Sequence, residues 1–170
     1  MTEITQTTRL ALRHLRLSDA AFITTLVNDS AWLRFIGDKS IGSIEDAERY
    51  LENGPLTMYA EHGFGLFAVV LRDTDALIGL CGLLRRDGLE RPDLGFAFLP
   101  EYRRNGFATE AAKATLVYAQ LVHGLTHVDA ITLPENEKSI ALLRRLKFDY
   151  QQDVQLPGDS DIVQRYTVKL

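Results

Sequence analysis

The stretch that decides the fold is PEYRRNGFATEAAKATLVYAQ, residues 100–120, where two arginines, an asparagine and a glycine precede a long alanine-rich segment. From Ala108 onward, small residues recur at spacings of three and four, which predicts a helix with one small-residue face. That face consists of Ala108, Ala111, Ala112, Thr115, Leu116 and Ala119. Because small side chains let a helix axis lie close to its neighbour, we expect this helix to pack tightly against a β-sheet.

The residues directly before this helix predict a site for an anion. Gly106 can adopt backbone angles closed to other residues, and it lets a ligand approach the backbone. The first four N–H groups of a helix lack partners within the helix, and together with the helix dipole they attract negative charge, here beside Arg103 and Arg104. The alternative is an ordinary helix start that is capped by Asn105 and flanked by solvated arginines. The stretch matches neither GxxxxGK[ST] nor GxGxxG, which argues against an ATP or dinucleotide loop.

Hydrophobic periodicity predicts further elements on both sides of the stretch. Strands are expected at 10–17, 64–72, 76–86, 92–100, 126–133, 148–156 and 162–170. Helices are expected at 20–29, from the cap Ser43 to a stop near Asn53-Gly54-Pro55, and at 135–147. A β-α-β-α-β run after a meander of three strands predicts a mixed sheet with helices packed on it. The expected class is α/β or α+β with three layers.

The composition is that of an ordinary soluble domain, with 46% hydrophobic and 25% charged residues among 170. We therefore expect one domain over residues 1–170. The net charge of −4 argues against a nucleic-acid binder and favours cationic partners such as amines. The single cysteine, Cys81, excludes an intramolecular disulfide and fits a buried small hydrophobe in a reducing cytoplasm.

Neither a leader nor a metal site is expected from the sequence. The N-terminus shows no signal-peptide pattern, and no apolar run is long enough to cross a membrane. The histidines share no metal-ligand spacing, so we expect no metal site. They are His14, His62, His123 and His127.

The pattern Arg103-x-x-Gly106-x-Ala108 after the strand FAFLP resembles the R/Q-x-x-G-x-G/A pyrophosphate loop of the GNAT superfamily of acyl-CoA-dependent N-acyltransferases. The order of elements is similar as well. The segments LRHLRLSDA, LIGLCGLL, DLGFAFLPEYRRNGFATEA and LPENEKSIALLRRLKF resemble the branch that contains the ribosomal-protein N-terminal acetyltransferases. The resemblance covers nearly the whole chain. It implies the GNAT fold, a mixed sheet of about seven strands with helices on both faces, splayed at the parallel pair that binds CoA.

This resemblance implies acetyl-CoA as the cosubstrate and assigns residues to it. The strand Phe96–Phe98 would bind the pantetheine arm through its backbone, residues Arg104–Thr109 would hold the pyrophosphate, and Asn136 would bond the arm from the other side. The implied set is Phe96, Ala97, Phe98, Arg103, Arg104, Asn105, Gly106, Phe107, Ala108, Thr109 and Asn136. Asn136 is equally suited to cap the following helix, and both roles are compatible. Ser139 would contact the thiol sulfur, or else is an ordinary residue of a first helical turn.

Acetyl transfer to an amine needs a neutral amine, and an exposed α-amine with a pKa of about 8 is easier to deprotonate than a lysine at about 10.4. A nearby carboxylate suffices as the base. The candidates are Asp93, Glu90 and Glu101, of which we favour Asp93, although each also fits a plain surface charge. A backbone N–H of Phe96–Phe98 would stabilise the oxyanion. Residues that could line the acceptor site are His62, Tyr59, Glu61 and Trp32.

The chain departs from the family pattern in two places. Many members carry a tyrosine seven residues after the asparagine as the general acid for the thiolate, where this chain has Leu143, so Ser139 or water must provide the proton. The common Leu-Gly-Phe is Leu146-Lys147-Phe148, which puts the local turn in doubt. The basic cluster of Arg144, Arg145 and Lys147 would reach the 3′-phosphate of CoA, or else forms a solvated helix face.

These features predict an N-acetyltransferase that moves an acetyl group from acetyl-CoA to a primary amine by direct attack on the thioester. A protein N-terminal α-amine is the leading acceptor. The alternatives are a small-molecule amine acetyltransferase and an acyl-CoA-binding module without turnover. Acceptor choice would lie in the first two helices and in the loop PGDSD, residues 157–161. We expect no nucleic-acid or membrane partner, and either a monomer or a homodimer.

Overall fold

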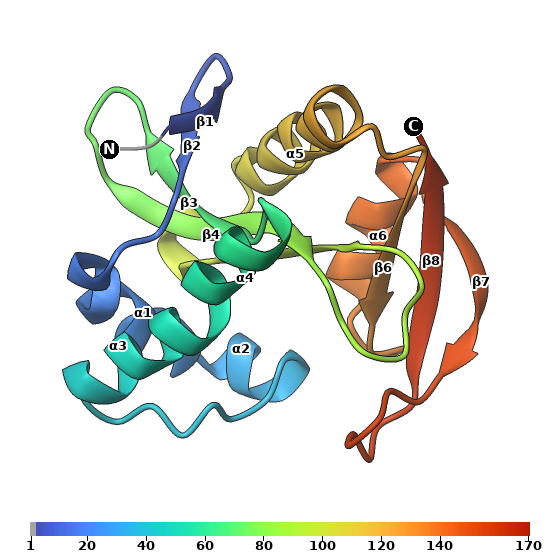
Figure 1. The fold of residues 1–170 in the computed structure, drawn as a ribbon, viewed down its shortest axis with the longest axis horizontal. Coiled ribbons are helices and arrows are strands. Elements are labelled where there is room, and N and C mark those ends of the chain that lie inside the picture. The colour runs from blue at the N-terminus through green and yellow to red at the C-terminus, as the bar shows by residue number, and fades with distance from the viewer. Residues whose placement is uncertain (1–2) are drawn as a thin grey trace.

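The computed structural model describes residues 3–170 and is built on one mixed β-sheet (Figure 1). Within these residues the sheet has eight strands in the order β1-β2-β3-β4-β5-β6-β8-β7. Their bounds are β1 Glu3–Gln6, β2 Leu10–Arg13, β3 Leu66–Leu71, β4 Leu77–Leu84, β5 Asp93–Phe98, β6 His127–Thr132, β7 Asp149–Val154 and β8 Val163–Lys169. Neighbouring strands are antiparallel except for the parallel pair β5–β6. The predicted mixed sheet is confirmed, and the strand beyond the expected seven is β1.

Helices cover both faces of the sheet, as predicted. Their bounds are α1 Ala20–Val27, α2 Ser30–Phe35, α3 Ile44–Leu51, α4 Thr57–His62, α5 Phe107–His123 and α6 Glu137–Arg145. Successive strand residues point to opposite faces, so Phe67 and Val69 pack with α5 and α6 while Ala68 packs with α1–α3. The layers are therefore helix, sheet and helix. Among the described residues, no helix is long and apolar enough to cross a bilayer.

The predicted end of the second helix near Asn53-Gly54-Pro55 is wrong. The chain stays helical through a wider π-helical turn, Glu52–Leu56, and continues as α4 until Gly63, which has a left-handed φ of 76°. Proline lacks the N–H that an α-helix needs, and the wider turn carries Pro55 without ending the helix. Helix α2 was not predicted from the sequence. Its N-cap Asp29 accepts hydrogen bonds from the N–H groups of Ala31 and Trp32.

The parallel strands β5 and β6 touch only at their beginnings. Their single paired position is Asp93 opposite Asp129, and the Asp129 N–H donates to the Pro92 carbonyl at 3.0 Å. Strand β5, by contrast, is paired with β4 along its whole length. The two parallel strands therefore diverge from Asp93 onward, which confirms the predicted splay.

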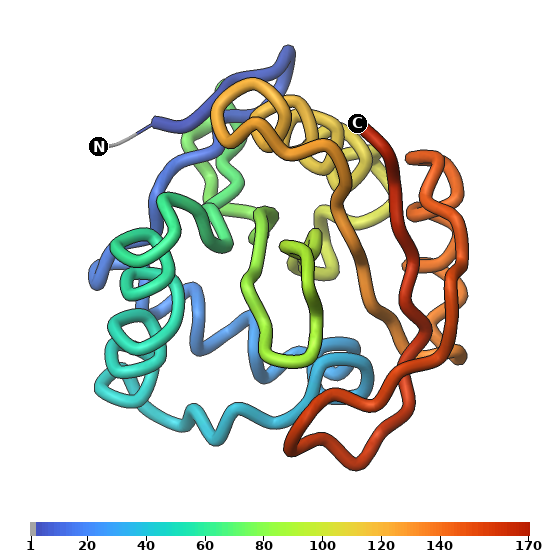
Figure 2. Tube along the Cα trace, turned by 45° about the vertical axis from the view of Figure 1, so that its right-hand side comes forward, coloured from blue at the N-terminus to red at the C-terminus, as the bar shows by residue number. Residues whose placement is uncertain are grey.

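The β4–β5 loop, residues 85–92, begins at the narrow end of this splay and extends between α4 and the β7–β8 loop (Figure 2). On one side the Arg85 N–H donates to Sδ of Met58 in α4 at 3.3 Å. On the other side a Cβ at Gly88 would lie 2.7 Å from Cδ of Pro157 in the β7–β8 loop. The loop thus lies between α4, which continues the second predicted helix, and residues 157–161, to which the sequence analysis assigned part of acceptor choice.

Candidate acyl-transfer site

The N-terminus of α5 is free of any side-chain cap. Gly106 is the N-cap residue, with a left-handed φ of 78°, and Arg104 also has a positive φ of 64°. The Asn105 side chain does not cap the helix, because its Nδ2 donates to the Arg103 carbonyl at 3.0 Å. Other helices of the protein are capped by side chains, namely α2 by Asp29, α3 by Ser43 and α6 by Asn136. The first amides of α5 are therefore available to an external acceptor such as a phosphate.

The two arginines of this loop differ in their surroundings. The Arg103 Nε donates to the Phe98 carbonyl at 3.0 Å, and its Nη2 pairs with Oδ2 of Asp29 at 2.6 Å. Burial raises the pKa of Asp29, but the hydrogen bond and charge of Arg103 outweigh it and hold that pKa below its usual value. Arg103 therefore ties the end of β5 to the start of α2. Arg104 is exposed to solvent.

Strand β5 presents an open backbone edge to the splay. Its other edge is bonded to β4 from Asp93 to Phe98, whereas β6 pairs with it only at Asp93. The side chains of Phe96 and Phe98 are packed on the α5 face and that of Ala97 on the opposite face. Beyond Asp93 the outward N–H and C=O groups have no strand partner, and of these the Phe98 carbonyl accepts from the Arg103 Nε. This arrangement fits the predicted backbone bonds to a pantetheine arm.

Asn136 caps α6 at the far side of the splay. Its Oδ1 accepts from the Ser139 N–H at 3.2 Å, so the capping role that the sequence allowed is present. This capping bond uses the Oδ1 of Asn136 and the backbone N–H of Ser139. The Nδ2 of Asn136 and the hydroxyl of Ser139 take no part in it. Both residues are half-buried. Their proposed bonds to the arm and to the sulfur stay predictions.

Asp93 lies at the narrow end of the splay and is buried. Its side chain is 1% exposed, and the Arg86 Nε donates to both of its carboxyl oxygens, at 3.0 and 3.1 Å. Burial raises the pKa of Asp93 to about 6, against the lowering effect of Arg86, and the neighbouring Asp129 adds to the rise. A pKa near 6 suits a general base, although the acceptor would have to reach a buried carboxyl. Its catalytic role stays a prediction, and the other two candidates, Glu90 and Glu101, are exposed.

Comparison with known proteins identifies the family to which the chain belongs. Residues 9–149 match the family model described as the acetyltransferase (GNAT) domain. The chain belongs to the GNAT family of acetyltransferases. It is an N-acetyltransferase of a family that uses acetyl-CoA, as the glycine loop and the splayed strands indicate.

Relatives and solved structures agree with this assignment. The acetyltransferase is 30% identical over 149 residues to the uncharacterized N-acetyltransferase YoaA of Bacillus subtilis (strain 168), covering 87% of this chain and 84% of YoaA. Among solved structures, RimL, a ribosomal L7/L12 α-N-protein acetyltransferase in complex with coenzyme A, superposes with a TM-score of 0.80 at 16% identity, over 99% of this chain and 98% of RimL. An acetyltransferase from Salmonella typhimurium that modifies the N-terminal serine of ribosomal protein L7/L12 gives a TM-score of 0.82 at 15% identity, over 99% of both chains. At these identities the solved structures establish the fold.

Leu143, which stands where many family members carry a tyrosine, lies in the core of this acetyltransferase. Leu143 is 1% exposed and packs in the cluster beneath α5 and α6. The helix then ends in a left-handed turn at Lys147, with φ of 70°, and the N–H of Phe148 donates to the Leu143 carbonyl at 3.0 Å. This closing bond is typical of a helix end with glycine at the left-handed position. The turn therefore forms despite the lysine. Lys147 and the neighbouring Arg144 and Arg145 are exposed.

The residues suggested for the acceptor site differ in their surroundings. Tyr59 is half-buried with its hydroxyl bonded to the Leu15 N–H and the Leu66 carbonyl, and Trp32 is 4% exposed and lies in the core. Glu61 is exposed, and His62 lies 3.8 Å from it.

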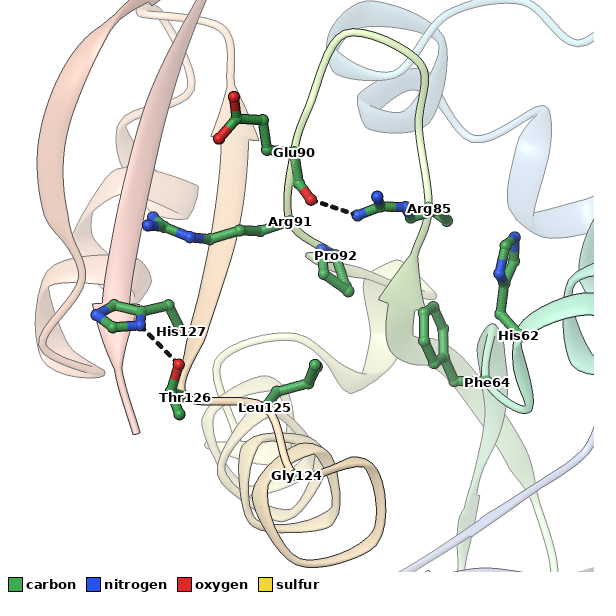
Figure 3. Close-up of a pocket in the computed structure, with 10 residues that line it drawn as sticks. All are labelled: His62, Phe64, Arg85, Glu90, Arg91, Pro92, Gly124, Leu125, Thr126 and His127. Atoms are coloured by element: carbon green, nitrogen blue, oxygen red, sulfur yellow. Dashed lines mark hydrogen bonds between the residues drawn. The ribbon is translucent and has the colours of Figure 1, made fainter.

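His62 lines an open cavity of about 460 Å³ that Figure 3 shows at the starts of β5 and β6. The cavity lies between the α4–β3 connection, the β4–β5 loop and the α5–β6 connection. The loop before α5, which we predict to hold the pyrophosphate and call the cofactor loop, follows the other end of β5. The cavity is therefore separate from the loop. Within residues 3–170, no three His, Cys, Asp or Glu side chains converge as a metal site requires.

The sequence analysis missed the contribution of the N-terminal hairpin. The turn between β1 and β2, Thr7–Arg9, lies against the first turn of the α5 helix through bonds to Glu110. A signal was present, because two short alternating segments, EITQ and LALR, flank the polar TTR as in a hairpin. The contact with a helix about a hundred residues later had no local signal.

Proposed function

We propose that this acetyltransferase acetylates a primary amine and that its leading acceptor is the α-amine of a protein N-terminus. The observation that carries the proposal is the uncapped start of α5 at Gly106 beside the open edge of β5. These two features offer donors for a pyrophosphate, at the first amides of α5, and for an amide-bearing arm, along the edge of β5. The likeness to enzymes that acetylate the N-terminus of a ribosomal protein supports the choice of acceptor.

The chain's own residues account for binding. Amides from Gly106 to Thr109 would hold the pyrophosphate, with the exposed Arg104 adding positive charge. The edge of β5 that faces the splay at Phe96–Phe98 and the Nδ2 of Asn136 would bond the pantetheine arm from opposite sides. When bound, acetyl-CoA supplies an activated thioester.

Three steps need protein groups near that thioester. A backbone N–H of β5 would meet the charge that develops on the carbonyl oxygen, and preformed donors of this kind contribute several kcal/mol. Asp93 would take the proton of the incoming amine, which an α-amine releases more readily than a lysine does. The Ser139 hydroxyl would donate a hydrogen bond to the sulfur as the thiolate leaves, and the hydroxyl would regain from water any proton that it passes on.

Acceptor choice would lie around the β4–β5 loop, because this loop touches both α4 and the β7–β8 loop. An acceptor on a ribosomal protein would place the enzyme in the cytoplasm, as the composition predicts. We propose that the enzyme acts as a monomer or as a homodimer.

A panel of acceptors tests the proposal through the release of free CoA. It contains peptides with free N-termini, the same peptides with blocked N-termini and an internal lysine, and polyamines. We expect release only with the free α-amine, and fragmentation mass spectrometry should place the acetyl group there. Turnover confined to polyamines would instead show a small-molecule enzyme. Turnover of the blocked peptides would show that the lysine side chain is the acceptor.

A further inference from the structure

The β1–β2 turn is fastened to the sheet and to α5 at the same time. The Arg72 N–H donates to the Arg9 carbonyl at 3.0 Å, and its Nη1 donates to the Thr7 carbonyl at 2.8 Å. On the other side, the Thr7 hydroxyl and the Arg9 N–H donate to Oε1 of Glu110, at 2.6 and 3.0 Å. Glu110 lies in the first turn of α5. The turn is therefore held at the start of the helix that begins at Gly106.

The Arg9 guanidinium reaches across this start. Its Nε and Nη2 each lie 2.7 Å from Oε2 of Glu110, and its Nη1 donates to the Asn105 carbonyl at 3.0 Å. The guanidinium carbon lies 4.4 Å from the centre of the Phe107 ring. A Cβ at Gly106 would lie 3.4 Å from Nη2, so the group also borders the glycine. One side chain thus contacts residues on both sides of Gly106.

We propose that Arg9 is a positioning residue for the cofactor loop, acting through the Asn105 carbonyl. The proposal rests on the proposed role of this loop in binding the pyrophosphate. In a trans peptide unit the C=O and the following N–H point in opposite directions. With the Asn105 oxygen held toward Arg9, the Gly106 N–H must point away from the hairpin. It then joins the free amides of the first turn on the side where a phosphate would bind.

Arg9 also removes an electrostatic conflict. A carboxylate in the first turn of a helix is favourable by itself, but it repels an anion that binds to the same amides. Burial raises the pKa of Glu110, yet the bonds from Thr7 and Arg9 outweigh it and keep that pKa low, so the carboxylate is charged at neutral pH. The guanidinium beside it neutralises this charge. Loss of Arg9 would leave Glu110 as an uncompensated negative charge next to the phosphate position.

The test compares two arginines that hold the same turn. Arg9→Gln should weaken binding of 3′-dephospho-CoA, which retains the pyrophosphate, by about tenfold, or about 1.4 kcal/mol. Arg72→Gln removes bonds to the turn without touching the loop, and its affinity should stay within about twofold of wild type. Calorimetry measures these constants. Pantetheine, which lacks the pyrophosphate, is titrated by NMR and should bind all variants equally. Arg9→Gln combined with Glu110→Gln should regain part of the lost affinity, because the repelling charge is gone.

The outcomes separate this inference from the proposed function. Wild-type affinity in Arg9→Gln, together with weak binding in Gly106→Val, overturns the role of Arg9 and keeps the loop assignment. Normal binding in both variants overturns the loop assignment as well. Equal weakening by Arg72→Gln, or equal loss for pantetheine, would show a general loosening of the fold and reject the positioning role. If Arg9→Gln does not fold, Arg9→Lys replaces it, because one ammonium group keeps the charge but cannot span Glu110 and the Asn105 carbonyl.

Discussion

At the scale of single residues, Ser139 bears on how the thiolate receives its proton. Leu143 stands where many family members carry a tyrosine and lies in the core, so Ser139 of the same helix is our candidate donor. We predict that Ser139→Ala lowers kcat by roughly tenfold to a hundredfold, because the bond to sulfur matters mainly in the transition state. Steady-state kinetics measures the effect, and calorimetry should find unchanged acetyl-CoA affinity.

The structure makes this substitution a clean test. The cap of α6 uses the Ser139 backbone N–H, which alanine retains, so thermal stability should not change. A variant that turns over at the wild-type rate would show that water protonates the thiolate.

Asp93 allows a second prediction, on pH. If this carboxyl is the base, the kcat/KM of the wild type should fall as pH drops below about 6, the pKa to which burial raises it. Asp93→Asn should then lose about a hundredfold to ten-thousandfold in kcat/KM at pH 7. A pH–rate profile of both proteins decides. An active variant with an unchanged acidic limb would assign the base elsewhere.

The carboxyl of Asp93 should also make the free energy of unfolding depend on pH. The dependence is opposite in sign to that of an aspartate whose pKa is lowered in the folded state. Its folded pKa of about 6 lies above its ordinary value of 3.8, so its favourable contribution is present below pH 4 and is lost as pH rises through 6. Asparagine does not titrate. The free energy of unfolding of Asp93→Asn, minus that of the wild type, should therefore rise by up to about 3 kcal/mol between pH 4 and 7. Urea denaturation at several pH values measures this difference, which would stay flat if the shift were absent.

At the scale of elements, β4 depends on a close backbone approach at Gly82. A Cβ there would lie 2.0 Å from the Gly65 carbonyl oxygen, which is backbone and cannot rotate away. We predict that Gly82→Ala destabilises the protein by about 3 kcal/mol, because strands β3 and β4 must move apart. The midpoint of urea denaturation reports the loss.

Gly54→Ala is the matched control for Gly82→Ala, because it makes the same substitution at a glycine with open space around it. A Cβ at Gly54 would find no heavy atom of the described residues within 4 Å, apart from its own neighbourhood in the helical turn. In a helical segment, alanine should stabilise by up to about 1 kcal/mol. Equal destabilisation by both substitutions would contradict the packing argument for β4.

At the scale of the whole molecule, the splay divides the sheet into two parts that a bound cofactor would connect. Strands β1–β5 and strands β6–β8 are joined through the single pairing at Asp93 and Asp129. A ligand that bonds β5 on one side and Asn136 on the other should therefore stabilise the folded state. At a CoA concentration of about 100 times Kd, we predict a gain of about 2.7 kcal/mol and a rise in Tm of roughly 5 to 11 °C.

Differential scanning calorimetry with and without CoA measures this gain. Gly106→Val should lose most of it at the same concentration of ligand. A wild-type Tm that CoA does not change would contradict the assignment of the splay as the cofactor site.

The elements of the site that depend on local chemistry were predictable from the sequence. Gly106 before the small-residue helix predicted a left-handed residue at the start of α5, because glycine has no Cβ to oppose that conformation. That Asn105 leaves this start uncapped was decided by the structure. Alternating and continuous apolar runs determined the strands and, with their order, the mixed sheet. The cap at Asn136 followed from its place before an amphipathic helix. In each case the physical cause lies within a few residues of the feature.

Other features were decided only by the tertiary structure. Arg9 meets Asn105 across 96 positions of sequence, and Arg103 meets Asp29 across 74, contacts that no local pattern encodes. By sequence, Asp93 was the favoured base or else a plain surface charge, and its burial became evident only where β5 pairs with β6 at Asp129. Side-chain partners and burial depend on which strands become neighbours. The sequence by itself therefore determined the glycine turn before α5, and the assembled sheet decided which side chains hold that turn in place.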